Sequence, residues 1–328
     1  MKPEKVFRIA LIQKPPVFLN LNESLIKAEK LIHQAAENGA ELVIFPETWL
    51  PGYPVWLDTA QGAAVWNHRG AKALYRILYQ NSLDMISKSF NGLIRISKKE
   101  KVTVVMGCHE VQGNTLYNTM VFFCGKTNVV ELHRKLMPTY NEKMIWGRGD
   151  GSTLSTIESD FGIIGGLICW EHWMPLARAA MHAKKEKIHV AQWPSVIDLH
   201  QMASRHYAFE GQCFVLACGC TLTKKDVLDG FESLDAKEPA AWDMLNSIAH
   251  TDNDYLMTGG SCVIGPDAGY IMEPEFNTKT IIYADLDPDL IKESSMVMDT
   301  DGHYSRPDIF SLTVNESPMQ NVRFLGKG

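Results

Sequence analysis

Short apolar segments rich in branched residues alternate with amphipathic segments along most of the chain, and this alternation constrains the fold more than any other feature. Segments 7–12 and 42–45 have the pattern of buried strands, and residues 20–39 between them repeat apolar side chains at helical spacing. Asn20 is a suitable residue to cap this helix, and Gly39 is suitable to end it. The N-terminal part therefore predicts a β-α-β unit whose parallel strands are buried on both faces.

The same alternation returns later in the chain and predicts a mixed α/β fold. Helices are expected at residues 83–99, 175–187 and 199–212, and strands at residues 102–106, 116–124, 128–132, 163–168, 189–192, 214–217, 261–264 and 280–284. Residues 52–81 and 222–258 follow neither period and are predicted to be long functional or assembly loops. Because no linker or tandem repeat divides the chain, we expect a single domain over residues 1–315 and a short tail at residues 316–328.

Charge and cysteine content exclude several classes of protein. The chain has 328 residues, with 32 Lys and Arg against 38 Asp and Glu, and a net charge of −6 is unfavourable for binding nucleic acid. The most apolar stretch, residues 161–170, is far shorter than the roughly 20 residues of a membrane-spanning helix. With no signal-peptide pattern, the seven cysteines are expected to be reduced thiols in a soluble, cytoplasmic protein.

A carboxylate follows the second predicted strand. Residues 42–45 are apolar and Pro46 stops the strand, so Glu47 is placed at the carboxyl end of a parallel strand, where α/β folds bind ligands. The plain alternative is a surface carboxylate in a turn. Aromatic residues in the Pro-rich loop that follows favour a site, because apolar walls raise the pKa of a carboxylate.

A basic residue follows another predicted strand. Lys135 comes after segment 128–132, and a basic group at a strand end is usually solvated or pairs with another part of the chain. The loop behind it, residues 140–151, combines charged residues, aromatic residues and glycines. Such a loop is costly to order unless it lines a site, so Lys135 is a candidate site residue.

A cysteine ends the most apolar strand. Residues 161–168 run directly into Cys169, and a helix is expected from Pro175. A thiol at a strand-to-helix turn is placed for nucleophilic attack near backbone N–H groups, as in a nucleophile elbow. Free cysteine is mostly protonated at pH 7, so a carboxylate is needed to accept the proton, and an ammonium to stabilise negative charge, shifting the pKa of the thiol downward. The alternative, a small buried apolar residue, suits most of the other cysteines.

Other chemistries find no support in the spacing of motifs. The cysteines and the eleven histidines lack the paired spacing of zinc sites, so no metal is expected. Neither a dinucleotide-binding glycine motif nor a phosphate-binding loop is present, and no cofactor is predicted. Ser195 is not in the setting of a serine hydrolase nucleophile.

The chain resembles the nitrilase superfamily of carbon-nitrogen hydrolases, and more closely its true nitrilase branch. The resemblance lies in residues 45–54 (FPETWLPGYP), 133–139 (HRKLMPT), 166–172 (GLICWEH) and 302–308 (GHYSRPD). It implies a four-layer α-β-β-α sandwich and a catalytic triad of Glu47, Lys135 and Cys169, with Glu142 as a second carboxylate. By this likeness an organic nitrile is the small-molecule substrate, converted through thioimidate and thioester intermediates to the carboxylic acid and ammonia without a cofactor.

The resemblance also suggests neighbours for the triad. Trp170 is expected to offer its backbone N–H to the developing anion and its ring as a wall, with core packing as the alternative. Tyr53, Trp146, Pro194 and Ile197 are expected to form a largely apolar substrate pocket. His172 is expected to support the nucleophile from behind, with no acid-base role.

Several alternatives remain open at this point. The same triad suits an amidase, a cyanide-degrading enzyme, or partial hydration of a nitrile to the amide. A non-catalytic assembly or binding protein that keeps the fold is the alternative from another class. The resemblance implies a homo-oligomer, and the segment at residues 222–258 is a candidate element between subunits. The short tail argues against a long filament.

Overall fold

Alternate residues of the strands face two different cores. In the computed structural model, which describes residues 5–235, 238–320 and 322, Ile9 and Leu11 of β1 lie in a core that joins both sheets, whereas Ala10 and Ile12 lie in a second core with the helices. Strands β2 and β3 alternate in the same way, with Ile44 in the first of these cores. Both faces of this sheet are therefore buried, which explains the continuous apolar runs.

Two mixed sheets form the centre of the molecule. The first has the strand order β13-β1-β2-β3-β4-β5, and its parallel pairs are β1 with β2 and β2 with β3. Its strands are β1 (Phe7–Ile12), β2 (Leu42–Ile44), β3 (Thr103–Gln112), β4 (Thr115–Cys124), β5 (Val130–Arg134) and β13 (Ile281–Leu286).

The second sheet has the order β10-β11-β9-β8-β7-β6, with β12 paired to β11. In this sheet β7, β8 and β9 are parallel neighbours. Its strands are β6 (Ile157–Ser159), β7 (Gly162–Ile168), β8 (Ile188–Gln192), β9 (Phe214–Cys218), β10 (Thr221–Thr223), β11 (Tyr255–Ile264) and β12 (Tyr270–Phe276).

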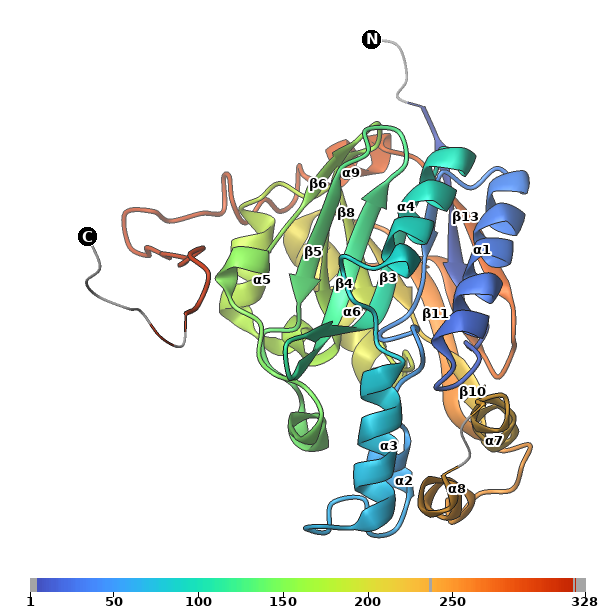
Figure 1. Cartoon of the computed structure of the whole chain (residues 1–328). Coiled ribbons are helices and arrows are strands. Elements are labelled where there is room, and N and C mark those ends of the chain that lie inside the picture. Colours follow the sequence, from blue (N-terminus) through green and yellow to red (C-terminus); the bar gives the residue numbers. More distant parts are fainter. Residues whose placement is uncertain (1–4, 236–237, 321, 323–328) are drawn as a thin grey trace, which may run out of the picture.

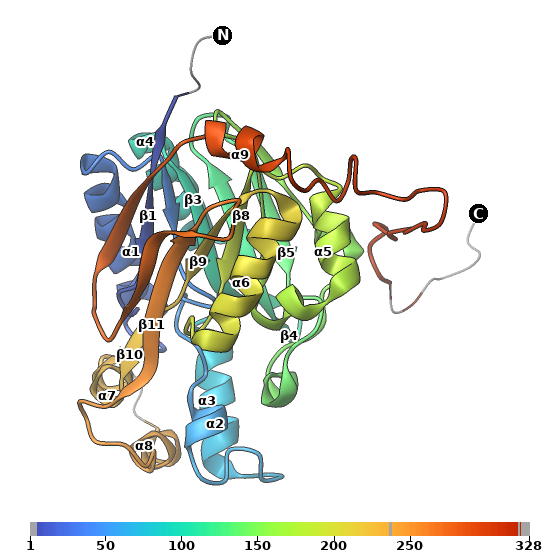
Figure 2. The ribbon, with the colours of Figure 1, turned by 180° about the vertical axis from the view of Figure 1, so that it is seen from behind.

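Helices cover the outer face of each sheet. Figure 1 shows α1 (Leu21–Glu37) and α4 (Lys88–Glu100) on the first sheet, and Figure 2 shows α5 (Pro175–His182) and α6 (Asp198–Gly211) on the second. A short helix, α9 (Asp289–Ser294), follows β13. The order helix, sheet, sheet, helix confirms the predicted four-layer α-β-β-α sandwich. No helix within the described residues is both long and apolar enough to cross a membrane.

The first helix forms for the local reasons expected from its sequence. The Asn20 side chain accepts a hydrogen bond from the backbone N–H of Glu23 at 3.2 Å, which is the geometry of an N-cap. Ala28, Ile32 and Ala35 are buried and share one face of the helix. This apolar face of the helix covers the outer face of the first sheet.

Two predicted loops are wrong, because both contain helices. Segment 52–81 holds α2 (Trp56–Thr59) and α3 (Arg69–Gln80), and segment 222–258 holds α7 (Lys224–Glu232) and α8 (Pro239–Asn246). Helix α3 packs against α8, and the four helices lie beyond one end of the sheets in Figure 1. Helices this short depend on such tertiary packing more than on their own propensity. Part of the expected tail at residues 316–328, residues 321 and 323–328, lies outside the described residues.

Candidate active site

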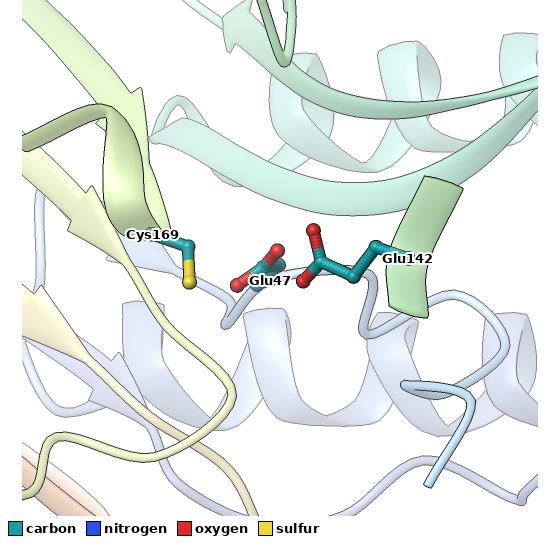
Figure 3. A group of neighbouring side chains, drawn as sticks. All are labelled: Glu47, Glu142 and Cys169. Carbon is teal, nitrogen blue, oxygen red and sulfur yellow. The ribbon is translucent and has the colours of Figure 1, made fainter. Parts of the chain in front are cut away.

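The structure brings the three predicted strand ends together. Glu47 lies three residues past the end of β2, Lys135 directly follows β5, and Cys169 directly follows β7. Strands β2 and β5 belong to the first sheet and β7 belongs to the second, so the cluster joins the two sheets. Figure 3 shows that Glu47, Cys169 and Glu142 point toward one another.

Lys135 bridges the two carboxylates of the cluster. Its Nζ donates to Oε1 of Glu47 at 2.8 Å and to Oε2 of Glu142 at 2.7 Å, and the Lys135 and Glu47 side chains have no exposed surface. Asn118 donates to the same Glu47 oxygen at 2.7 Å, and the Tyr53 hydroxyl donates to Oε1 of Glu142 at 2.9 Å. Both carboxylates are therefore fixed in position by charge-assisted hydrogen bonds.

Cys169 occupies a strained turn beside the carboxylate of Glu47. Its φ angle is 55°, in the left-handed region that side chains other than glycine rarely adopt, and strain of this kind concentrates at functional sites. The reactive atoms of Cys169, Glu47 and Glu142 all lie within 4.8 Å of one another. Oε2 of Glu47 is buried and has no hydrogen-bond partner, so it is available to accept the thiol proton.

Burial sets the protonation state of the cluster. It raises the pKa of Glu47 to about 7, with the charge of Glu142 acting in the same direction and Lys135 against it. Burial and the Glu47 charge raise the pKa of the Cys169 thiol well above its ordinary value, although Lys135 acts to lower it. The expected downward shift in the pKa of this thiol is therefore wrong, because burial and Glu47 outweigh Lys135. Cys169 rests as a thiol, and its activation requires a base.

Lys135 stays charged, although burial disfavours its ammonium group. Burial lowers its pKa, but Cys169 once it is ionised, together with Glu47 and Glu142, outweighs this effect and raises the pKa above its usual value. Glu47, Glu142 and Cys169 lie as close together as the ligands of a metal ion do. The ammonium already donates to both carboxylates, so it supplies the positive charge that a metal ion would otherwise bring to the cluster.

Glu171 fixes the backbone next to the nucleophile Cys169 and next to Lys135, a role that the sequence did not predict. One of its oxygens accepts from the backbone N–H of Leu136 at 2.7 Å, and the other accepts from that of Ile168 at 2.6 Å. These two groups are next in sequence to Lys135 and Cys169. His133 completes the contacts of Glu171, with Nε2 at 2.9 Å. This buried carboxylate therefore ties the end of β5 to the end of β7.

His172 and Trp170 differ in burial and in their relation to the nucleophile. His172 is buried, and its Nδ1 lies 2.7 Å from the carbonyl oxygen of Cys169, so it contacts the backbone and not the sulfur. The Trp170 side chain is 45% exposed and is not part of either core, which contradicts core packing as its role. The Trp170 backbone N–H acts to lower the pKa of the Cys169 thiol, against the larger effect of burial.

The four residues predicted to line a pocket lie in two groups. Tyr53 and Trp146 pack edge to face, with ring centroids 5.9 Å apart, and both flank the cluster through Glu142 and Lys135. Pro194 is half-buried after β8, and Ile197 is 47% exposed at the start of α6. A single pocket formed by all four residues stays a prediction.

The contacts that the sequence did not reveal come from residues without a local motif. Asn118 lies in the middle of β4, and nothing around it in the sequence distinguishes it from an ordinary strand residue. Glu171 is two residues beyond Cys169, and two of its partners, Leu136 and His133, are distant in the chain. A charged residue two positions after a candidate nucleophile was the available signal for Glu171, whereas Asn118 offered none.

The chain matches the family model described as carbon-nitrogen hydrolase over residues 8–295. It is 35% identical to Nitrilase 2 of Arabidopsis thaliana over 327 residues, which covers 98% of this chain and 92% of that protein. It is 34% identical over 325 residues to a bifunctional nitrilase/nitrile hydratase of Nicotiana tabacum, covering 97% of this chain and 88% of the relative.

Solved structures of the same fold agree with these sequence matches. A carbon-nitrogen hydrolase from Helicobacter pylori superposes with a TM-score of 0.66 at 16% identity, covering 89% of this chain and 93% of that chain. At this level of identity the similarity shows the fold alone. The sequence relatives, which match along nearly their whole lengths, show the family.

Proposed function

The chain belongs to the carbon-nitrogen hydrolase family, and from this premise we propose that it is a nitrilase that hydrolyses an organic nitrile to the carboxylic acid and ammonia. The observation that carries the proposal is that three buried groups lie together: the Glu47 carboxylate, the Lys135 ammonium and the Cys169 thiol. Relatives named nitrilases match nearly the whole chain and support a nitrile as the substrate.

In the first step, Oε2 of Glu47 accepts the proton of the Cys169 thiol as the sulfur attacks the nitrile carbon. A C–S bond forms, one C–N π bond breaks, and the nitrogen takes up that electron pair together with the proton returned by Glu47. The product is a covalent thioimidate. Lys135 and the Trp170 backbone N–H lie where they can stabilise the negative charge that develops during the attack.

Two water molecules complete the reaction. Glu47 takes a proton from the first water as it adds to the thioimidate carbon, and proton transfer to the nitrogen lets ammonia leave, giving a thioester. The second water, activated in the same way, breaks the C–S bond and releases the carboxylic acid and the free thiol. Glu142 keeps Lys135 aimed at the reacting centre through its hydrogen bond to Nζ.

The identity of the products tests the proposal. The protein should be incubated with aliphatic, aromatic and arylacetic nitriles of graded bulk, and ammonia, carboxylic acid and amide should each be quantified. Equal amounts of acid and ammonia support a nitrilase. Amide as the main product supports partial hydration, which the bifunctional relative from Nicotiana tabacum makes the second candidate. Turnover of amides with inert nitriles would contradict the proposal, as would complete inactivity, the result expected of an assembly protein.

We further propose that the protein is a homo-oligomer that pairs through the surface of α5 and α6. Large apolar side chains are exposed there although the helices' other faces are buried: Leu176 is 68% exposed and Met202 is 60% exposed. Residues 304–320 extend away from the body next to this surface in Figure 2, and Phe310 on this segment is 76% exposed. Contiguous exposed apolar surface is typical of a protein interface.

The remaining proposals concern domain structure and location. We propose that residues 1–315 act as one domain, which the family match over residues 8–295 supports. All seven cysteines are free and buried, which supports a reducing, cytoplasmic environment. The helices within residues 222–258 keep their proposed role as an element between subunits, secondary to the surface of α5 and α6.

A further inference from the structure

A line of buried polar side chains leads away from the nucleophile across the second sheet. It starts at the Cys169 carbonyl, which lies 2.7 Å from Nδ1 of His172. Nε2 of His172 lies 3.0 Å from Nε2 of His189, whose Nδ1 lies 2.9 Å from Oε2 of Glu186. The Tyr207 hydroxyl donates to Oε1 of Glu186 and ends the line. Each of these side chains is less than a tenth exposed.

The Cys169 carbonyl, together with the neutral state of both imidazoles, determines which group donates in each hydrogen bond of this line. The Cys169 carbonyl only accepts, so His172 carries its hydrogen on Nδ1. With both imidazoles neutral, Nε2 of His172 accepts from Nε2 of His189, and Nδ1 of His189 in turn needs a donor. Glu186 supplies that donor as a neutral carboxylic acid, while its other oxygen accepts from Tyr207.

The electrostatics of the line agree with this assignment. Burial lowers the pKa of His172 to about 3 and that of His189 well below its ordinary value, so both rings are neutral. Burial raises the pKa of Glu186 to about 7, against opposing effects of Tyr207 and His182. Gly165 on β7 makes room for the acid, because a Cβ at this position would lie 2.1 Å from Oε2 of Glu186.

The line of buried polar side chains can affect catalysis through the peptide bond that joins Cys169 and Trp170. The Cys169 carbonyl and the Trp170 N–H belong to the same planar trans peptide, so they point in opposite directions. When His172 holds the carbonyl, the N–H points away from His172, and it acts to lower the pKa of the Cys169 thiol. We propose that His172, His189 and Glu186 are positioning residues that fix the orientation of the Trp170 N–H toward the charge that develops at Cys169.

This inference rests on the proposed nitrile hydrolysis and makes a specific kinetic statement about it. A backbone donor that stabilises the transition state affects kcat and leaves substrate binding unchanged. Loss of one such donor lowers kcat by roughly 100-fold. Breaking the line at Glu186, remote from the substrate, should therefore lower kcat at constant KM.

Two substitutions of similar size separate positioning from simple packing. Glu186→Gln retains an N–H to donate to His189 and an oxygen to accept from Tyr207, so it should keep the wild-type kcat. Glu186→Met has a similar length and neither group, and it should lose roughly 10- to 100-fold in kcat with KM unchanged. Wild-type kcat in Glu186→Met would overturn the proposal, as would an equal loss in both variants. If the Met variant does not fold, a loss of kcat in folded Glu186→Gln would still overturn the proposal, and retention would support it.

A double-mutant cycle tests whether the effect passes through His172. His172→Phe preserves stacking on Trp193, whose ring centroid lies 4.8 Å away, but removes the hydrogen bond to the Cys169 carbonyl. Adding Glu186→Met to this variant should cause no further loss of kcat, whereas additive losses would contradict the proposal.

Alkylation of Cys169 separates failure of this inference from failure of the proposed function. Iodoacetamide reacts with the thiolate and requires no nitrile, and mass spectrometry of the Cys169 peptide follows the rate. The inference predicts slower alkylation in Glu186→Met than in Glu186→Gln even if no nitrile is turned over. Equal alkylation rates would overturn the inference and leave nitrile hydrolysis unaffected.

Discussion

The Nζ of Lys135 lies 2.8 Å from Oε1 of Glu47, and neither side chain has any exposed surface. Removing two charges from water is costly, and the cost is recovered only where geometry and further hydrogen bonds are good. Here Asn118 and Glu142 supply those further bonds. One oxygen of Glu47 nevertheless remains without a hydrogen-bond partner, and the carboxylate lies close to the thiol. This arrangement leaves a base ready for reaction, and testable consequences follow from it.

The acid side of the pH dependence of kcat/KM should show the ionisation of Glu47 near 7. Glu47 accepts the thiol proton only as a carboxylate, and burial raises its pKa to about 7. The rate should therefore increase as the pH rises from 5 through the pKa of Glu47. Above pH 7 it should fall again, because Glu186, whose pKa is also about 7, then loses the proton that it donates to His189. Glu47→Gln should lose roughly 10²- to 10⁴-fold and show no such rise. A profile that is flat between pH 5 and 8 in the wild type would exclude Glu47 as the base.

Replacing Lys135 should reduce stability as well as activity. Lys135→Met leaves Glu47 and Glu142 buried without their cation, and breaking a buried pair in this way costs about 3–5 kcal/mol in the free energy of unfolding. Denaturant unfolding measures this cost. The matched control is Lys184→Met, because its pair with Glu316 is solvent-exposed and should contribute about 0–1 kcal/mol. Equal effects of the two substitutions would contradict the account of the buried pair.

Glu171→Gln should impair folding stability and activity together. The amide of Gln has one oxygen, so it cannot accept both backbone N–H groups that Glu171 accepts. The Gln side chain also carries no charge to pair with His133. We expect the free energy of unfolding to fall by about 3 kcal/mol. Burial raises the pKa of Glu171, but His133 and the backbone N–H groups outweigh it and lower the pKa overall. The stabilising contribution is therefore present above the unfolded pKa and is lost as the pH falls through the folded value.

Thermal unfolding between pH 7 and pH 3 measures the contribution of Glu171. The melting temperature of the wild type should fall more steeply with acid than that of Glu171→Gln, which lacks this titrating group. Glu158→Gln, at an exposed carboxylate, is the control and should resemble the wild type. Parallel acid profiles of the wild type and Glu171→Gln would show that Glu171 does not stabilise the fold as a carboxylate.

Charge placed on the apolar surface of α5 and α6 should disrupt the oligomer. Leu176→Glu combined with Met202→Glu introduces two buried charges into the proposed interface, while each residue is solvent-exposed in the single chain. Sedimentation velocity should show a smaller particle than for the wild type. Ile86→Glu, at a side chain that is 88% exposed elsewhere, is the control. An unchanged particle size would place the interface on another surface.

The candidate site residues at the ends of strands were predictable because local sequence patterns mark where each strand ends. Each of Glu47, Lys135 and Cys169 follows an apolar segment whose end is visible in the residues themselves, and parallel strands bring such ends to one edge. The N-cap at Asn20 and the strand at Phe7–Ile12 were likewise fixed by local pattern. These features need no knowledge of distant contacts.

What the sequence did not reveal depends on long-range contacts. Helices α3 and α8 are short and stabilise each other across more than 150 positions of the chain, so their segments looked irregular. The raised pKa of Cys169 arises from complete burial beside two carboxylates, which no spacing of residues displays. Asn118 acquires its role when β4 meets the end of β2 within the first sheet, and Glu171 when the ends of β5 and β7 meet across the two sheets.

Ammonia release by Cys169→Ala tests the central claim most directly, because this account assigns every covalent step to that sulfur. The variant removes one atom from a buried turn and should fold as the wild type does, as circular dichroism and the melting temperature can verify. With a nitrile that the wild type hydrolyses, the account predicts no ammonia above the uncatalysed background. Sustained ammonia release by the folded variant would contradict nucleophilic attack by Cys169.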